Sequence, residues 1–65
     1  QAIRVFPVPS PTGIFNLTIA SDWIVYSVNG IKILSGTGTI VDISSFSKGT
    51  YFLKMKDGTK SLLYN

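Results

Sequence analysis

The segment that most constrains the fold is WIVYSVNGIKIL, residues 23–34 of a chain of 65 residues. Its first half, Trp23 to Val28, is apolar on both faces of an extended strand, which is typical of a strand inside a sheet. Asn29 and Gly30 both tolerate positive φ, as a two-residue type I′ turn requires, and Ile31 to Leu34 returns from that turn. This segment therefore predicts a β-hairpin with a buried first strand.

Short β-rich segments separated by turn residues continue in both directions from this hairpin. Five more strands are predicted, at residues 3–6, 14–19, 39–43, 50–55 and 60–64. Breaks are predicted at residues 20–22 and 35–38, a loop at 44–49, and a second hairpin turn at Asp57-Gly58. No window carries the 3.6-residue apolar period of a helix. The sequence thus predicts an all-β fold, a small Ig-like sandwich of about seven antiparallel strands in two sheets.

The connection between the first two predicted strands is rich in proline. Pro7, Pro9 and Pro11 favour an extended segment that lacks donors for a ladder. Gly13 is expected to end it in a turn with positive φ. Near the other end of the chain, residues 50–55 alternate, and Tyr51 and its inward neighbours are expected to face the core.

The composition excludes most catalytic and metal-binding chemistry. The chain has no cysteine, histidine or glutamate, so a thiolate or imidazole metal site cannot form. Its only acids are Asp22, Asp42 and Asp57, all near turns or strand ends, where aspartate makes local backbone hydrogen bonds. Asp42 is also expected to cap the loop that follows it. We therefore expect no enzyme activity, no cofactor and no metal ion.

Six basic residues face three acidic ones, and four lysines (Lys48, Lys54, Lys56 and Lys60) lie in the last eighteen residues. A nucleic-acid interface needs denser clustering of Arg and Lys, so no nucleic-acid partner is expected. Lysines on solvent-facing and edge strands keep a β-protein soluble. No apolar run approaches the roughly eighteen residues of a membrane span.

The aromatic residues raise an alternative, an accessory β-sandwich that binds carbohydrate for an attached enzyme. Stacking on sugars needs rings on one exposed face, whereas strand alternation puts Trp23 and Tyr26 on opposite faces. Aromatic residues of small sandwiches belong more often to the core. Carbohydrate binding stays the second hypothesis, and a structural spacer module is the third.

Several motifs, in order along the chain, resemble the type A C-terminal sorting domains of type IX secretion. Phe6-Pro7-Val8-Pro9, followed by Gly13 and Phe15, looks like the family's Tyr-Pro-Asn-Pro opening, with Val8 in place of Asn. Residues 25–30 resemble its central hairpin, although Ile31 precedes the basic Lys32. Residues 42–55 are similar to the segment that leads from Asp-Leu-Ser through a loop to Gly-x-Tyr and an alternating strand. The chain end lacks the basic residue often seen there.

The resemblance implies that residues 1–65 are a single C-terminal sorting domain, a fragment of a larger secreted precursor. Such a domain directs an upstream cargo in the same precursor from the periplasm through a type IX translocon in the outer membrane. The cargo then reaches the cell surface or the medium, and a sortase-like surface peptidase commonly removes the domain.

A sorting signal acts through a preformed surface. The candidate recognition residues combine outward lysines with a terminal edge strand that can pair with a partner strand, and they are Gly49, Tyr51, Lys54, Lys56, Gly58 and Lys60. A competing interpretation is that Gly49 and Tyr51 are only a turn residue and a core residue. The residues expected to shape the fold are Pro7, Pro9, Gly13, Asn29, Gly30 and Asp42.

Overall fold

The computed structural model describes residues 2–65, and these form five β-strands with no helix. The strands are β1 (Val5–Phe6), β2 (Ile14–Ser27), β3 (Lys32–Asp42), β4 (Gly49–Met55) and β5 (Gly58–Tyr64). The predicted all-β class is therefore confirmed. Over this described part of the chain, no helix is long and apolar enough to cross a membrane.

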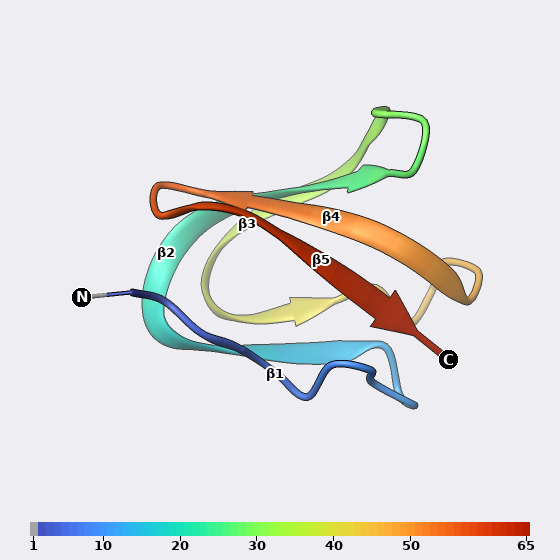
Figure 1. Ribbon diagram of the computed structural model, residues 1–65, viewed down its shortest axis with the longest axis horizontal. Coiled ribbons are helices and arrows are strands. Elements are labelled where there is room, and N and C mark those ends of the chain that lie inside the picture. The colour runs from blue at the N-terminus through green and yellow to red at the C-terminus, as the bar shows by residue number, and fades with distance from the viewer. Residues whose placement is uncertain (1) are drawn as a thin grey trace.

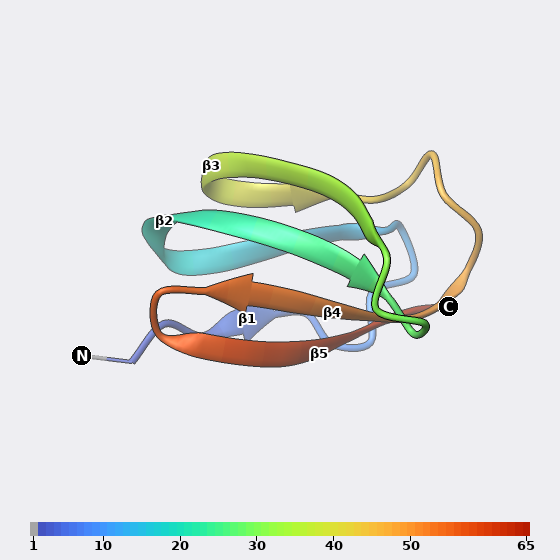
Figure 2. The same ribbon diagram turned by 90° about the horizontal axis from the view of Figure 1, so that it is seen from above.

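All five strands belong to one antiparallel sheet in which β2 is central. β3 pairs along one side of β2, while on the other side β1 pairs with its beginning and β4 with its end. β5 lies beside β4. Figure 1 shows β2 and β3 curving together, so that the sheet curls around one of its faces. The core lies on this inner face. Figure 2 shows the same curvature from above.

The structure has five strands where the sequence predicted seven. The predicted breaks at residues 20–22 and 35–38 lie inside β2 and β3, respectively. Asn16 pairs with Ile40 and Ser21 pairs with Gly38, so β2 holds extra residues between these pairs. A bulge of this kind bends a strand without ending its ladder. Each pair of predicted short strands is thus one long bent strand, and the arrangement in two separate sheets is not confirmed.

Trp23 explains why glycine occurs within the bent strand β3. The indole of Trp23 is only 6% exposed and lies opposite Gly36 across the ladder. A Cβ on Gly36 would stand 2.6 Å from Cζ2 of the indole. Residues 35–38 were predicted as a break between two strands, but Gly36 leaves the space in which a core tryptophan packs.

The first hairpin forms, but its turn is not type I′. No residue other than glycine has positive φ in the described chain, so Asn29 does not meet that requirement, whereas Gly30 has φ +80°. The amide of Gly30 donates to the carbonyl of Ser27 (2.9 Å), and the amide of Ser27 donates to the carbonyl of Ile31 (2.8 Å). These bonds define a three-residue loop that ends in a left-handed glycine.

The core occupies the inside of the curled sheet. In β4 the predicted alternation is confirmed, since Tyr51, Leu53 and Met55 are buried while the residues between them are exposed. The remaining buried apolar side chains come from the other strands and their flanks, and they are Ile3, Phe15, Leu17, Trp23, Val25, Val41, Ile43 and Leu62. One core therefore unites segments from both ends of the chain.

The proline-rich connection pairs with the end of β5. We did not expect this pairing, because prolines lack the backbone amide that donates in a ladder. Ser10 is fully buried and forms a parallel bridge with Tyr64. Its amide donates to the carbonyl of Leu63 (2.8 Å), and its carbonyl accepts from the amide of Asn65 (3.1 Å). We call this contact between Ser10 and residues 63–65 the clasp. It links the beginning of the domain to its end.

Candidate recognition surface

The β4–β5 hairpin carries all six candidate recognition residues, but it presents them in different ways. Its register pairs Met55 with Gly58, so the turn residues are Lys56 and Asp57. The predicted turn at Asp57-Gly58 is thus displaced by one residue. Gly58 opens β5 with φ +123°, which favours glycine over residues that carry a side chain. Lys56 and Gly58 are exposed around this turn.

Gly49 and Tyr51 shape the hairpin from its other end. Gly49 begins β4 with φ +148°, and the space around its Cα is open. Tyr51 is 7% exposed and packs in the core, where its hydroxyl donates to the carbonyl of Ser47. A side chain so buried has little surface to offer a partner, which favours the interpretation of Tyr51 as a core residue.

The three candidate lysines do not lie on one face of the hairpin. Lys54 is directly opposite Thr59, and Lys60 is directly opposite Leu53. Because neighbouring strand positions point to opposite sides, Lys54 and Lys60 face opposite ways. Lys56 lies at the turn between them. The lysines therefore supply positive charge to three different regions around the hairpin.

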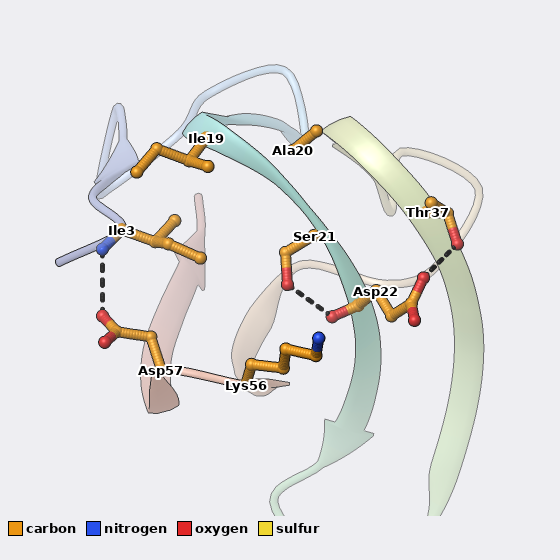
Figure 3. Close-up of a pocket in the computed structure, with 8 residues that line it drawn as sticks. All are labelled: Ile3, Ile19, Ala20, Ser21, Asp22, Thr37, Lys56 and Asp57. Atoms are coloured by element: carbon orange, nitrogen blue, oxygen red, sulfur yellow. Dashed lines mark hydrogen bonds between the residues drawn. The ribbon is translucent and has the colours of Figure 1, made fainter. Parts of the chain in front are cut away.

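Lys56 borders a pocket that has a volume of about 530 Å³. Figure 3 shows this pocket between the bend of β2, the β4–β5 turn and the segment around Ile3. Both aspartates that line this pocket already accept a hydrogen bond. The carboxylate of Asp22 accepts from the hydroxyl of Thr37 (2.7 Å), and that of Asp57 accepts from the amide of Ile3 (2.9 Å).

Asp57 was expected to serve only its own turn. Instead its carboxylate holds a residue 54 positions away in the sequence. No pattern in the sequence announces this long-range bond, because an Asp-Gly pair is fully explained by the turn alone.

Lys60 borders a second pocket of about 390 Å³ between β1 and β5. The other lining residues are Arg4, Val5, Val8 and Ser61. Here β1 and β5 approach without forming a ladder, since in the described chain β1 pairs with β2 and β5 pairs with β4. Two contacts join this side of the sheet, the bond between Ile3 and Asp57 before β5 begins and the clasp at the far end of β5.

The residues expected to shape the fold lie at defined places in it. Gly13 has φ +80°, and its carbonyl accepts from the amide of Ile43 (2.8 Å), which secures the end of β3. Pro7 and Pro9 lie in the connection that leads from β1 to Ser10. Ser10 itself was not singled out from the sequence, although a serine between two prolines offers one amide in a segment otherwise poor in donors.

Asp42 caps the loop after β3, as predicted. Its Oδ1 accepts from the hydroxyl of Ser44 (2.6 Å) and from the amide of Ser44 (2.9 Å). These two bonds stabilise the carboxylate and lower the pKa of Asp42 below its ordinary value of 3.8. The group is fully exposed, and its role is to fix the local backbone.

The aromatic residues do not form a platform that includes Trp23, because its ring is buried. Tyr26 is half-buried and lies opposite Phe52 on the other side of the sheet. Within residues 2–65, no group of three acidic, histidine or cysteine residues is arranged to hold a metal ion.

Comparison with known families identifies one match that covers nearly the whole chain. A family model described as a secretion system C-terminal sorting domain matches residues 4–64. A search of curated proteins gives no match. The matched range includes the proline-rich connection, both hairpins and the clasp except for Asn65.

Proposed function

Because the chain belongs to the family of secretion system C-terminal sorting domains, we propose that its folded surface is what a type IX secretion system recognises. The family is a C-terminal sorting signal for type IX secretion, so the chain is such a signal. Its cargo lies upstream in the same precursor and is exported to the cell surface or the extracellular space. The family match over residues 4–64 carries this conclusion.

We further propose that residues 1–65 act as one non-catalytic domain that enters the translocon from the periplasm. A sortase-like surface peptidase then removes the domain after the cargo has crossed the outer membrane. The single core shared by β1 to β5 supports the view that the domain travels and is recognised as a unit.

For direct contact with the translocon we propose the turn and the open edge of the last hairpin. The exposed candidates are Lys54, Lys56, Gly58 and Lys60, while Gly49 and Tyr51 set the shape of the hairpin from within. The edge of β5 that faces away from β4 meets the clasp only near Tyr64, so its first residues can pair with an extended partner strand.

The experiment that tests the sorting role fuses residues 1–65 to a fluorescent reporter with an export leader, in a bacterium that has type IX secretion. We expect the reporter at the cell surface or in the medium, and we expect it in the periplasm when the translocon is deleted. Retention of a folded fusion in the periplasm of the wild-type strain would contradict the proposal.

A further inference from the structure

The convex side of β2, β4 and β5 carries a set of side chains that do not belong to the core. Its side chains occupy the strand positions between the buried ones, and we call this surface the outer face. Its members are Ile24, Tyr26, Lys32, Thr50, Phe52, Lys54, Thr59, Ser61 and Leu63. The labelled strands β2, β4 and β5 that bear most of it can be followed in Figure 1.

The centre of the outer face is apolar. Tyr26 lies directly opposite Phe52, and Leu63 is the diagonal neighbour of Phe52 on β5. Phe52 and Leu63 are each 38% exposed, and Ile24 is half-buried beside them. None of these four side chains belongs to the buried core. The exposed part of these side chains is apolar contact area that the core leaves free.

The charges directly opposite the apolar residues of β2 are both positive. Lys32 lies opposite Tyr26, and Lys54 lies opposite Ile24, so a lysine flanks each of these residues. Asp22 lies two positions before Ile24, at the end of this face, and its carboxylate accepts from the hydroxyl of Thr37. Asp42 and Asp57 lie outside β2, β4 and β5, and their carboxylates bond to Ser44 and to the amide of Ile3. The outer face thus combines an apolar centre with a border that has a net positive charge.

We propose that the outer face is the docking surface for a protein partner whose own surface has an apolar centre bordered by carboxylates. This inference rests on the sorting role and specifies which surface is recognised. A second copy of the chain is a poor occupant, because each face carries two lysines against one aspartate, and that aspartate is already bonded to Thr37. An anionic lipid surface usually needs about four or more clustered basic residues, and this face has two.

Two substitutions on the outer face test this assignment in the reporter fusion. Phe52→Ser removes the central ring, and Lys54→Glu reverses the charge that faces the partner. Each should lower the exported fraction by about tenfold, the loss expected of a residue at the centre of an interface. Lys54→Arg should be exported like the unchanged fusion, because it keeps the positive charge.

Matched controls lie on other parts of the surface. Ile40→Ser removes an apolar side chain that is 52% exposed on β3, and Arg4→Glu reverses an exposed charge near β1. Both should be exported like the unchanged fusion. Folding of every fusion is checked by protease resistance, and if Phe52→Ser does not fold, Lys54→Glu decides the question.

The outcomes separate this inference from the sorting role. If the unchanged fusion is exported, and folded Phe52→Ser or Lys54→Glu is exported equally well, the outer face is not the docking surface. Equal losses in the controls would also overturn it. Binding of the unchanged chain to phosphatidylglycerol vesicles, lost in Lys54→Glu, would assign the surface to lipid instead. Retention of the unchanged fusion would speak against the sorting role itself.

Discussion

At the scale of single residues, Gly13 combines a left-handed backbone with close neighbours. It has φ +80°, and a Cβ there would stand 2.8 Å from Cα of Ser44 and 3.0 Å from Cζ of Tyr64. Gly30 has the same φ but open space around it. The two glycines therefore separate the cost of backbone conformation from the cost of crowding.

We expect Gly13→Ala to destabilise the domain by about 3 kcal/mol, the sum of a left-handed backbone and an overpacked contact. Gly30→Ala should cost only about 1 kcal/mol, because it lacks the crowding. Urea unfolding followed by Trp23 fluorescence measures both values. Equal losses of unfolding free energy in the two variants would show that Ser44 and Tyr64 move aside easily. Export of any folded Gly13→Ala fusion should stay normal, because this residue shapes the fold.

The carboxylate of Asp42 makes stability depend on pH on the acid side. Its pKa is lowered in the folded state by the bonds from Ser44, so the ionised form favours folding. This contribution is present above the unfolded value of 3.8 and is lost as the pH falls through the lower folded pKa. We expect Asp42→Asn to reduce the drop in unfolding free energy between neutral pH and the acid limit. Unfolding titrations of both proteins across this range provide the measurement, and identical pH profiles would contradict it.

The sequence predicted the roles of Gly13 and Asp42 because each acts through its own backbone or its immediate neighbour. It did not predict the roles of Ser10 and Asp57. Both bond to residues more than fifty positions away, Leu63 and Ile3, and local patterns carry no record of such partners.

At the scale of elements, the two long bent strands are the main departure from the prediction. Turn residues at 20–22 and glycines at 36 and 38 indicated breaks, and the irregularity of the ladder lies next to them, between the pairs Asn16–Ile40 and Ser21–Gly38. Whether a bend ends a strand depends on whether its neighbour bends with it. β2 and β3 bend together and keep their ladder, which only the pairing of both strands reveals.

The bend places Trp23 on Gly36, so substitution of this glycine should disturb the element. We expect Gly36→Ala to cost about 2 kcal/mol, because its Cβ would overlap an indole ring in the core. Ser35→Ala, at an exposed neighbouring position, should change stability by less than about 0.5 kcal/mol. Unfolding curves and the emission maximum of Trp23 report both effects. An unchanged emission maximum would mean that the indole does not move.

The last hairpin tests the role of positive charge. We expect the combined replacement of Lys54, Lys56 and Lys60 by Gln to reduce export of the reporter fusion while the domain stays folded, because all three side chains are exposed. The effect of Lys54 alone should account for most of the loss if the outer face is the docking surface. Normal export of the triple variant would remove the lysines from the mechanism.

At the scale of the whole molecule, the core is shared by residues from Ile3 to Leu62, and the clasp joins Ser10 to residues 63–65. The all-β class and most strand positions could be predicted from alternation and turn residues. Closure of the sheet could not be, because it depends on a backbone contact between the proline-rich connection and the chain's last residues. A domain of this size has little stability to spare, so such a contact matters.

Removal of Tyr64 and Asn65 should therefore lower the unfolding free energy by about 3 kcal/mol, through loss of the Asn65 amide from the clasp and of an aromatic ring packed on the core. Asn65→Ala keeps the amide that bonds to Ser10 and should be nearly neutral. Thermal and urea unfolding of the three proteins measure the difference. Equal stability of the shortened and full chains would show that the clasp contributes nothing.

Because of the clasp, the domain closes fully only in a chain that contains residues 63–65. The segment around Ser10 finds its partner only in residues 63–65, which the ribosome adds after the rest of this sheet. A precursor cut short by a premature stop or by a protease before Leu63 cannot close the sheet in this way. A secretion system that recognises the closed domain would then not export truncated precursors. The sorting signal would therefore also serve as quality control.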